Sequence, residues 1–113
     1  MTSAYAGPAG DALPAGDALW LRVSRSFTAW TSGDVRGLDE LVRIMTPVLW
    51  HCIRSSGLSA HSTEDVVQTT FLALVRGRDS IRDPQAVAGW LVTTARREAW
   101  RTSRSASRSQ PVD

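Results

Sequence analysis

Four stretches of the chain place apolar residues three and four positions apart, the spacing that aligns them on one face of an α-helix. We expect helices at about 17–31, 35–55 and 62–76, and a fourth that starts at Asp83-Pro84 and continues past Trp100. No stretch alternates apolar and polar residues as a strand would. The sequence therefore predicts an all-α fold, a compact bundle of about four helices.

Signals for helix ends fall between these stretches. Ser62 and Thr63 supply hydroxyls that can cap the third helix, and Glu64 and Asp65 place negative charge in its first turn. Pro47 lies inside the second helix, where it is expected to kink the helix or free a carbonyl near Arg43. A glycine is expected to end each of the first three helices, at Gly33, Gly57 and Gly77.

The ends of the 113-residue chain differ in composition from its middle. Residues 1–16 are rich in Ala, Gly and Pro, and residues 105–113 are rich in Ser and Arg. We expect a flexible N-terminal tail, one folded domain at 17–104, and a C-terminal linker or tail. The first residues lack the features of a secretory signal, and no apolar run approaches the length of a membrane span.

Catalytic and metal-binding signatures are weak in this sequence. Cys52 is the only cysteine and lies on an apolar helical face, which favours a small core residue and a cytoplasmic setting. His51 is expected on a helix surface and His61 in a loop. We therefore expect no metal, no cofactor and no enzymatic activity, because nucleophile, metalloprotease and phosphate-loop motifs are all missing.

Charge is distributed unevenly along the chain. All 13 basic residues are Arg; residues 76–108 hold eight Arg against three acids, a net charge of +5, whereas residues 1–75 carry −2. The fourth helix gathers much of this charge on one side, together with two tryptophans. Its exposed side is predicted to contain Trp90, Thr93, Arg97, Trp100, Arg101 and Arg104. Arginines with interleaved aromatics suit a nucleic acid, although a solvated arginine-rich helix face would have the same pattern.

The third helix has a second notable face. Asp65, Gln68 and Leu72 follow one another at spacings of three and four. Such a mixed patch suits a partner helix that offers an apolar groove and an arginine. The alternative is a solvent-facing helix with one stray leucine. The opposite, core-facing side is predicted to hold Val66, Val67, Thr70, Phe71, Leu74 and Val75.

Three segments together resemble conserved region 2 of bacterial sigma factors, and most of all the extracytoplasmic-function (ECF) subgroup. They read AWTSGDVRGLDELVRIMTPVLW, STEDVVQTTFLALV and AVAGWLVTTARREAWR. The resemblance covers about residues 27–104, in the family's order and with its spacing. The most specific element is EDVVQ with a following phenylalanine, succeeded downstream by the Trp-Leu pair of the fourth helix.

The resemblance implies two partners for this chain. The third helix would dock on the clamp coiled coil of the β′ subunit of core RNA polymerase, through Asp65 and Gln68, with Glu64 and Leu72 beside them. The fourth helix and its preceding loop would hold the melted non-template strand of the promoter minus-ten element. The implied base-capture loop is Asp79, Ser80, Ile81, Arg82 and Asp83. The implied DNA-binding residues of the helix are Trp90, Thr93, Arg96, Arg97, Trp100, Arg101 and Arg104. Family members are also often held inactive by an anti-sigma protein that covers these faces.

The chain departs from the family pattern in two respects. Val92-Thr93-Thr94 and Glu98 stand where the family usually has bulky residues and an asparagine, so base preference does not carry over. A second, helix-turn-helix domain that reads the minus-35 element is not present in these residues. We expect an excised region 2, and the alternative is a protein that naturally lacks that domain. An alternative is a sigma-like regulatory protein that occupies polymerase or an anti-sigma factor without directing initiation, and a further one is a general helical RNA-binding protein.

Overall fold

The computed structural model describes the backbone of residues 12–109 and the side chains of residues 18–105. This part of the chain is all-helical, as the sequence predicts. The 3₁₀ turns η3 and η4 link the last two helices. The elements are α1 (Ala12–Thr31), α2 (Arg36–Arg54), α3 (Ala60–Gly77), η3 (Arg78–Ser80), η4 (Pro84–Ala86) and α4 (Val87–Ser109).

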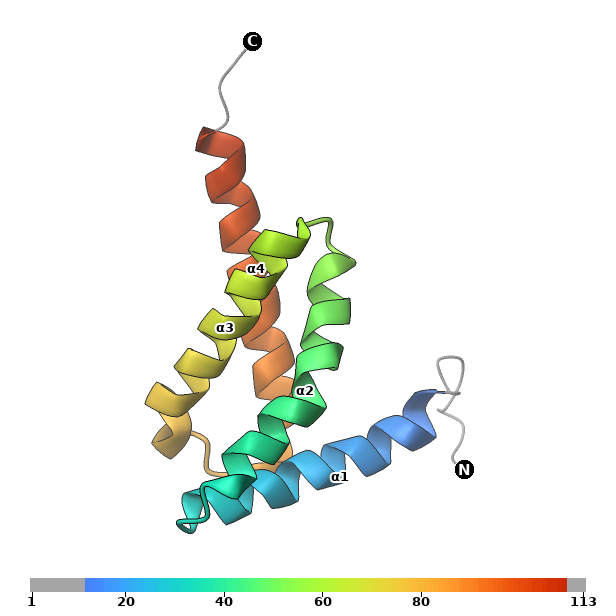
Figure 1. Cartoon of the computed structure of the whole chain (residues 1–113), viewed down its shortest axis with the longest axis vertical. Coiled ribbons are helices and arrows are strands. Elements are labelled where there is room, and N and C mark those ends of the chain that lie inside the picture. The colour runs from blue at the N-terminus through green and yellow to red at the C-terminus, as the bar shows by residue number, and fades with distance from the viewer. Residues whose placement is uncertain (1–11, 110–113) are drawn as a thin grey trace.

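The helices form one compact bundle (Figure 1). α2 and α3 form a hairpin, and α4 packs against both. α1 crosses the lower end of this group in the view of Figure 1, where it contacts α2, α4 and η4. The last turns of α4 extend beyond the hairpin.

The core is built from the apolar stripes that the sequence predicts. Each helix contributes one side, and α4 contributes its small residues, so that it packs closely on α2 and α3. The two buried threonines of α3 satisfy their hydroxyls within the helix, because Thr63 Oγ1 donates to Ser59 O and Thr70 Oγ1 to Val66 O, both at 2.7 Å. The buried apolar residues are Val23, Phe27, Trp30, Leu41, Ile44, Met45, Leu49, Ile53, Val66, Val67, Leu74, Val87, Ala88, Leu91, Ala95 and Ala99.

Glycine shapes the junction between α1 and α2. Gly33 has a φ of 109°, a left-handed conformation that ends α1 as expected. Gly37 lies in the first turn of α2 directly against α1, and a Cβ atom there would be 2.4 Å from Ser26 O and 2.6 Å from Trp30 N. The crossing of α1 over α2 therefore depends on the missing side chain at position 37.

Two helices are longer than the sequence predicts. α1 begins at Ala12, five residues before the expected start, and α4 continues to Ser109, beyond the expected domain end at 104. The Ala-rich and Ser/Arg-rich compositions had favoured tails at these positions. The rest of the predicted tails, residues 1–11 and 110–113, lies outside the described residues.

The start of α3 is also earlier than predicted. Ser59, not Ser62, is the N-cap: its backbone is extended, and its side chain accepts a hydrogen bond from Ser62 N at 3.1 Å. His61 consequently lies in the first turn of α3 and not in a loop. Val75 was predicted in the core but is 45 % exposed, since it faces the groove between α2 and α3 and not the bundle centre.

α2 is continuous through Pro47, whose side chain is exposed. Because proline has no N–H, it cannot bond the carbonyl of Arg43. The neighbouring Thr46 hydroxyl donates to Val42 O at 2.6 Å, so that carbonyl has a hydrogen bond from a side chain. Proline at this exposed position disturbs no buried contact.

Candidate nucleic-acid and protein-binding surfaces

The exposed side of α4 forms the surface that we call the arginine face. Its members are Trp90, Thr93, Arg96, Arg97, Trp100, Arg101 and Arg104. All are exposed except Trp90, which is half-buried, packs on the core and lies beside Gly77. Trp90 therefore belongs to the boundary of the surface, and the other six residues form its open part.

Local contacts order part of the arginine face. The guanidinium carbon of Arg104 lies 4.8 Å from the centroid of the Trp100 ring, a cation–π contact, and Trp100 is itself 62 % exposed. Arg101 is paired with Glu98 at 2.7 Å. Arg96 and Arg97 form no ion pair with any described residue, so their charges are available to a partner. A surface hollow is lined by Thr93, Arg96, Arg97, Trp100 and Arg101.

The loop before α4 divides into anchored and open positions. Ile81 is half-buried against the core, and Asp83 Oδ1 accepts a hydrogen bond from Gln85 N at 2.9 Å, which caps η4. Asp79, Ser80 and Arg82 are exposed. Of the five residues predicted for base capture, Ile81 and Asp83 thus hold the loop, Asp79 is exposed but lies 3.7 Å from Arg78 Nε, and Ser80 and Arg82 are exposed.

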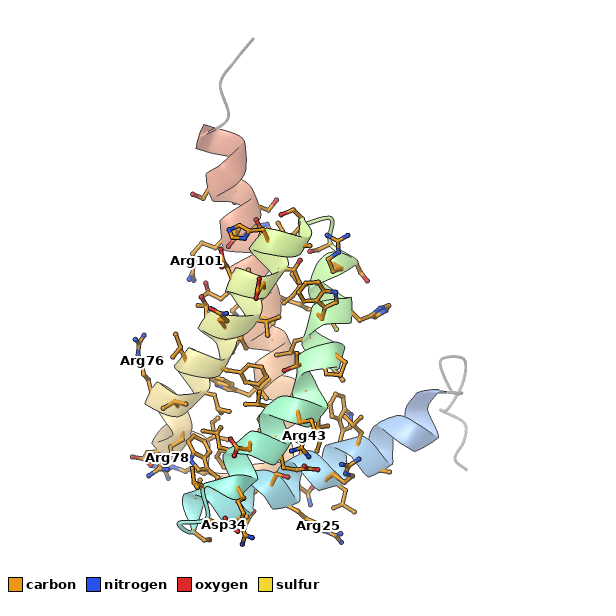
Figure 2. The ribbon with its side chains drawn as sticks, viewed as in Figure 1. Arg25, Asp34, Arg43, Arg76, Arg78 and Arg101 are labelled. Atoms are coloured by element: carbon orange, nitrogen blue, oxygen red, sulfur yellow. The ribbon has the colours of Figure 1, made fainter. Side chains whose placement is uncertain are left out.

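The start of this loop is fixed from α1. The Arg78 guanidinium lies over the Trp30 ring at 5.0 Å from its centroid. In Figure 2, Arg78 lies at the base of the bundle, while Arg76 and Arg101 extend on one side of it from α3 and α4. Arg76 thus adds exposed positive charge on α3, outside the arginine face of α4.

A second surface, which we call the α3 face, contains Glu64, Asp65, Gln68 and Leu72. All four are exposed, as predicted, and Leu72 is 53 % exposed. His61 Nε2 lies 3.6 Å from Asp65 Oδ2, close enough to pair when the imidazole is protonated.

Leu72 is not a stray surface leucine. It lines an apolar groove between α2 and α3 together with Leu38, Val42, Gln68, Phe71 and Val75. The sequence missed the α2 contribution because a wheel of one helix carries no information on its neighbour. An apolar groove lined by Gln68, with Asp65 three residues earlier on the same exposed face, suits an amphipathic helix that carries basic residues.

A third hollow lies between α1 and α2 and is highly charged. Figure 2 shows Arg25, Asp34 and Arg43 around this end of the bundle. Most of its charges are paired: Glu40 bridges Arg22 at 2.7 Å and Arg43 at 2.8 Å. Hydrogen bonds from the side chain and the backbone N–H of Arg36 lower the pKa of Asp34 below its ordinary value of 3.8. The Arg22–Glu40 ion pair therefore links α1 to α2, and the hollow has little unpaired charge for a ligand.

Two other classes of site are not found in the described residues. No group of three or more His, Cys, Asp and Glu side chains could hold a metal ion. None of the described helices combines the length and the apolarity needed to cross a membrane. Cys52, predicted in the core, is half-buried and lines a hollow between α2 and α4.

The fold is an all-helical bundle with two exposed surfaces of different chemistry, the arginine face and the α3 face. The family model of sigma-70 region 2 matches residues 41–109, more than half of the chain and all of α3 and α4. The chain belongs to this family, which is non-enzymatic and acts in transcription initiation through RNA polymerase and promoter DNA. Comparisons with curated proteins and with solved structures gave no match.

Proposed function

We propose that this chain is the promoter-recognition domain of a sigma factor of the ECF subgroup, acting in the cytoplasm. It works by binding: the α3 face attaches it to core RNA polymerase, and the arginine face and the loop 79–83 hold the opened minus-ten strand. Strand opening is then favoured by capture of bases in their single-stranded state. The domain needs no cofactor for this function.

The α3 face supports docking on the β′ clamp coiled coil. Its acid and amide, Asp65 and Gln68, stand at the positions that make this contact in the family, and both are exposed. The groove beside them is apolar and continues onto α2 through Leu38 and Val42. A clamp helix with basic residues would thus meet complementary charge and bury the exposed Leu72. An anti-sigma protein would act by covering the same face.

The observation that carries the DNA part of the proposal is the exposed arrangement of Arg96, Arg97 and Trp100 around one hollow. Guanidinium groups neutralise phosphates, and an exposed indole provides a stacking surface for an unpaired base. Arg104 already lies against the Trp100 ring, which restricts the rotamers of both side chains before a strand arrives.

A selection on pre-opened templates tests this function. Bubble templates with randomised non-template bases are incubated with core polymerase and the chain, and the retained templates are sequenced. We expect the wild type to retain templates with a minus-ten preference, the double variant Arg97→Ala/Arg101→Ala to retain far fewer templates of any sequence because phosphate contacts are lost, and the charge-matched control Arg36→Ala/Arg43→Ala to behave as the wild type. Both control residues line the hollow between α1 and α2.

Two other outcomes would point elsewhere. Polymerase binding without any base preference would favour the regulatory alternative, in which the domain occupies polymerase without directing initiation. Tight binding of single strands in the absence of polymerase would favour a general RNA- or DNA-binding protein. Either result would contradict the proposed function.

A further inference from the structure

A hollow between the end of α2 and the second half of α4 has no role in the function proposed above. It has a volume of about 290 Å³, and we call it the α2–α4 hollow. It is more enclosed than a surface groove because two packed helices form its sides. Its lining residues are Cys52, Ile53, Ser56, Arg96, Ala99, Trp100 and Ser103.

The α2–α4 hollow adjoins the arginine face directly. Arg96 and Trp100 line both this hollow and the one on the arginine face. These two side chains therefore stand between the two depressions. A strand that lies along the arginine face passes the entrance of the α2–α4 hollow at Trp100.

The chemistry of the lining suits a flat heteroaromatic ring. Ile53 and Ala99 are buried and form an apolar floor, and the Trp100 indole forms a wall. The edge is polar: Arg96 supplies N–H donors, and Ser103 supplies a hydroxyl. Ser56 Oγ donates to Ile53 O at 2.6 Å, so its remaining lone pairs are oriented to accept. An apolar face with donors and acceptors at its margin is what a nucleobase requires.

We propose that the α2–α4 hollow accepts one unpaired base of the strand held on the arginine face. The base stacks on Trp100, and its edge meets Arg96, Ser56 and Ser103. This inference rests on the proposed function, since the strand must first lie along α4. It adds a base-binding site separate from the loop 79–83, on the middle turns of α4.

Cys52 gives this inference a direct readout, because it is the only cysteine of the chain and lines the hollow. The probes are a random-sequence oligodeoxynucleotide and an abasic oligodeoxynucleotide of the same length. Each is added to the chain assembled with core polymerase, and iodoacetamide alkylation of the Cys52 peptide is followed by mass spectrometry. The abasic strand has the phosphates but no bases, so it controls for shielding by the backbone and by polymerase.

At an oligonucleotide concentration about ten times its Kd, we expect alkylation of Cys52 to slow roughly tenfold with the base-containing strand. The abasic strand at matched occupancy should leave the rate unchanged. Equal rates with both strands, while both bind, would overturn the inference and leave the proposed function intact. Failure of both strands to bind would overturn the proposed function and this inference together.

A filled hollow provides an independent test that does not depend on thiol reactivity. Ser103 is exposed, so Ser103→Phe should place a ring in the hollow without disturbing the core. Ser55→Phe adds the same ring at an exposed position that does not line the hollow. We expect Ser103→Phe to weaken binding of the base-containing strand about 5- to 150-fold, the usual effect of losing one stacked base. The abasic strand should bind this variant and the control equally, and equal losses with both strands would contradict the inference.

Discussion

Gly37 determines how closely α1 and α2 approach. An added Cβ would meet two backbone atoms, Ser26 O at 2.4 Å and Trp30 N at 2.6 Å, and backbone cannot yield as a flexible side chain can. We expect Gly37→Ala to lower the free energy of unfolding by about 1–3 kcal/mol, as for other overpacked sites. Urea denaturation measures the change.

Gly89 is the matched control, because it is also helical and nothing lies within 4 Å of a Cβ built there. Gly89→Ala should raise the free energy of unfolding by about 0.4–1 kcal/mol, since alanine restricts the unfolded chain. If both variants behaved alike, the contact at Gly37 would not be the tight one described.

Asp34 gives the α1–α2 turn a dependence on pH. The hydrogen bonds from Arg36 lower its pKa in the folded chain below the ordinary 3.8. The stabilisation is therefore present above pH 3.8 and is lost as pH falls through the lower, folded-state pKa. Asp34→Asn should lack this component, so the stability advantage of the wild type should be constant well above pH 3.8 and shrink as the pH falls below about 3.8. Chemical denaturation at several pH values measures it, and a constant difference would contradict the assignment.

The number, order and apolar sides of the helices follow from the sequence, because a 3.6-residue period needs only local information. Their ends were less predictable. Ser59 and Ser62 both precede helical residues, and only the extended backbone of Ser59 identifies it as the cap. The surfaces were likewise predictable only in part. Helical wheels predicted that Asp65 and Trp100 are exposed, because this depends on one helix. The groove beside Leu72 and the hollow beside Cys52 could not be predicted, because each is formed by two helices.

The start of α3 can be tested by removing each candidate cap. Ser59→Ala should lower the free energy of unfolding by about 1 kcal/mol, because Ser62 N loses its acceptor. Ser62→Ala should change it little, since the described cap does not use the Ser62 hydroxyl. Thermal or chemical unfolding compares the two variants. A larger effect of Ser62→Ala would contradict Ser59 as the cap and favour a start of α3 at residue 62.

The arginine face of α4 should show two distinguishable contributions to strand binding. Arg97→Ala should reduce the slope of log Kobs against log salt by about 0.7, the effect of losing one phosphate contact on a single strand. Trp100→Ala should weaken binding by about 1–3 kcal/mol and leave the slope unchanged, because stacking releases no counterions. Fluorescence anisotropy of a labelled oligonucleotide over a salt series, with core polymerase present, measures both. The opposite pattern would contradict the assignment of phosphate and base contacts.

In the molecule as a whole, one bundle presents two surfaces with different chemistry. α3 carries the acidic and apolar α3 face, and α4 carries the arginine face, while the core between them fixes their relative positions. Under the proposed function, the α3 face would attach to a protein and the arginine face to a nucleic acid. The uneven charge of the sequence corresponds to this arrangement, because the acidic part before residue 76 contains most of α3 and the basic part after it contains α4.

The central claim is that the α3 face attaches this domain to core RNA polymerase. A pull-down of core polymerase with the wild-type chain, with Asp65→Ala/Gln68→Ala, and with the control Asp39→Ala/Gln85→Ala tests it most directly. The control removes one exposed acid and one exposed amide elsewhere on the surface. We predict that the wild type and the control retain polymerase and that the α3-face variant loses it, with all three folded by circular dichroism. Absence of binding by the folded wild type would contradict the account.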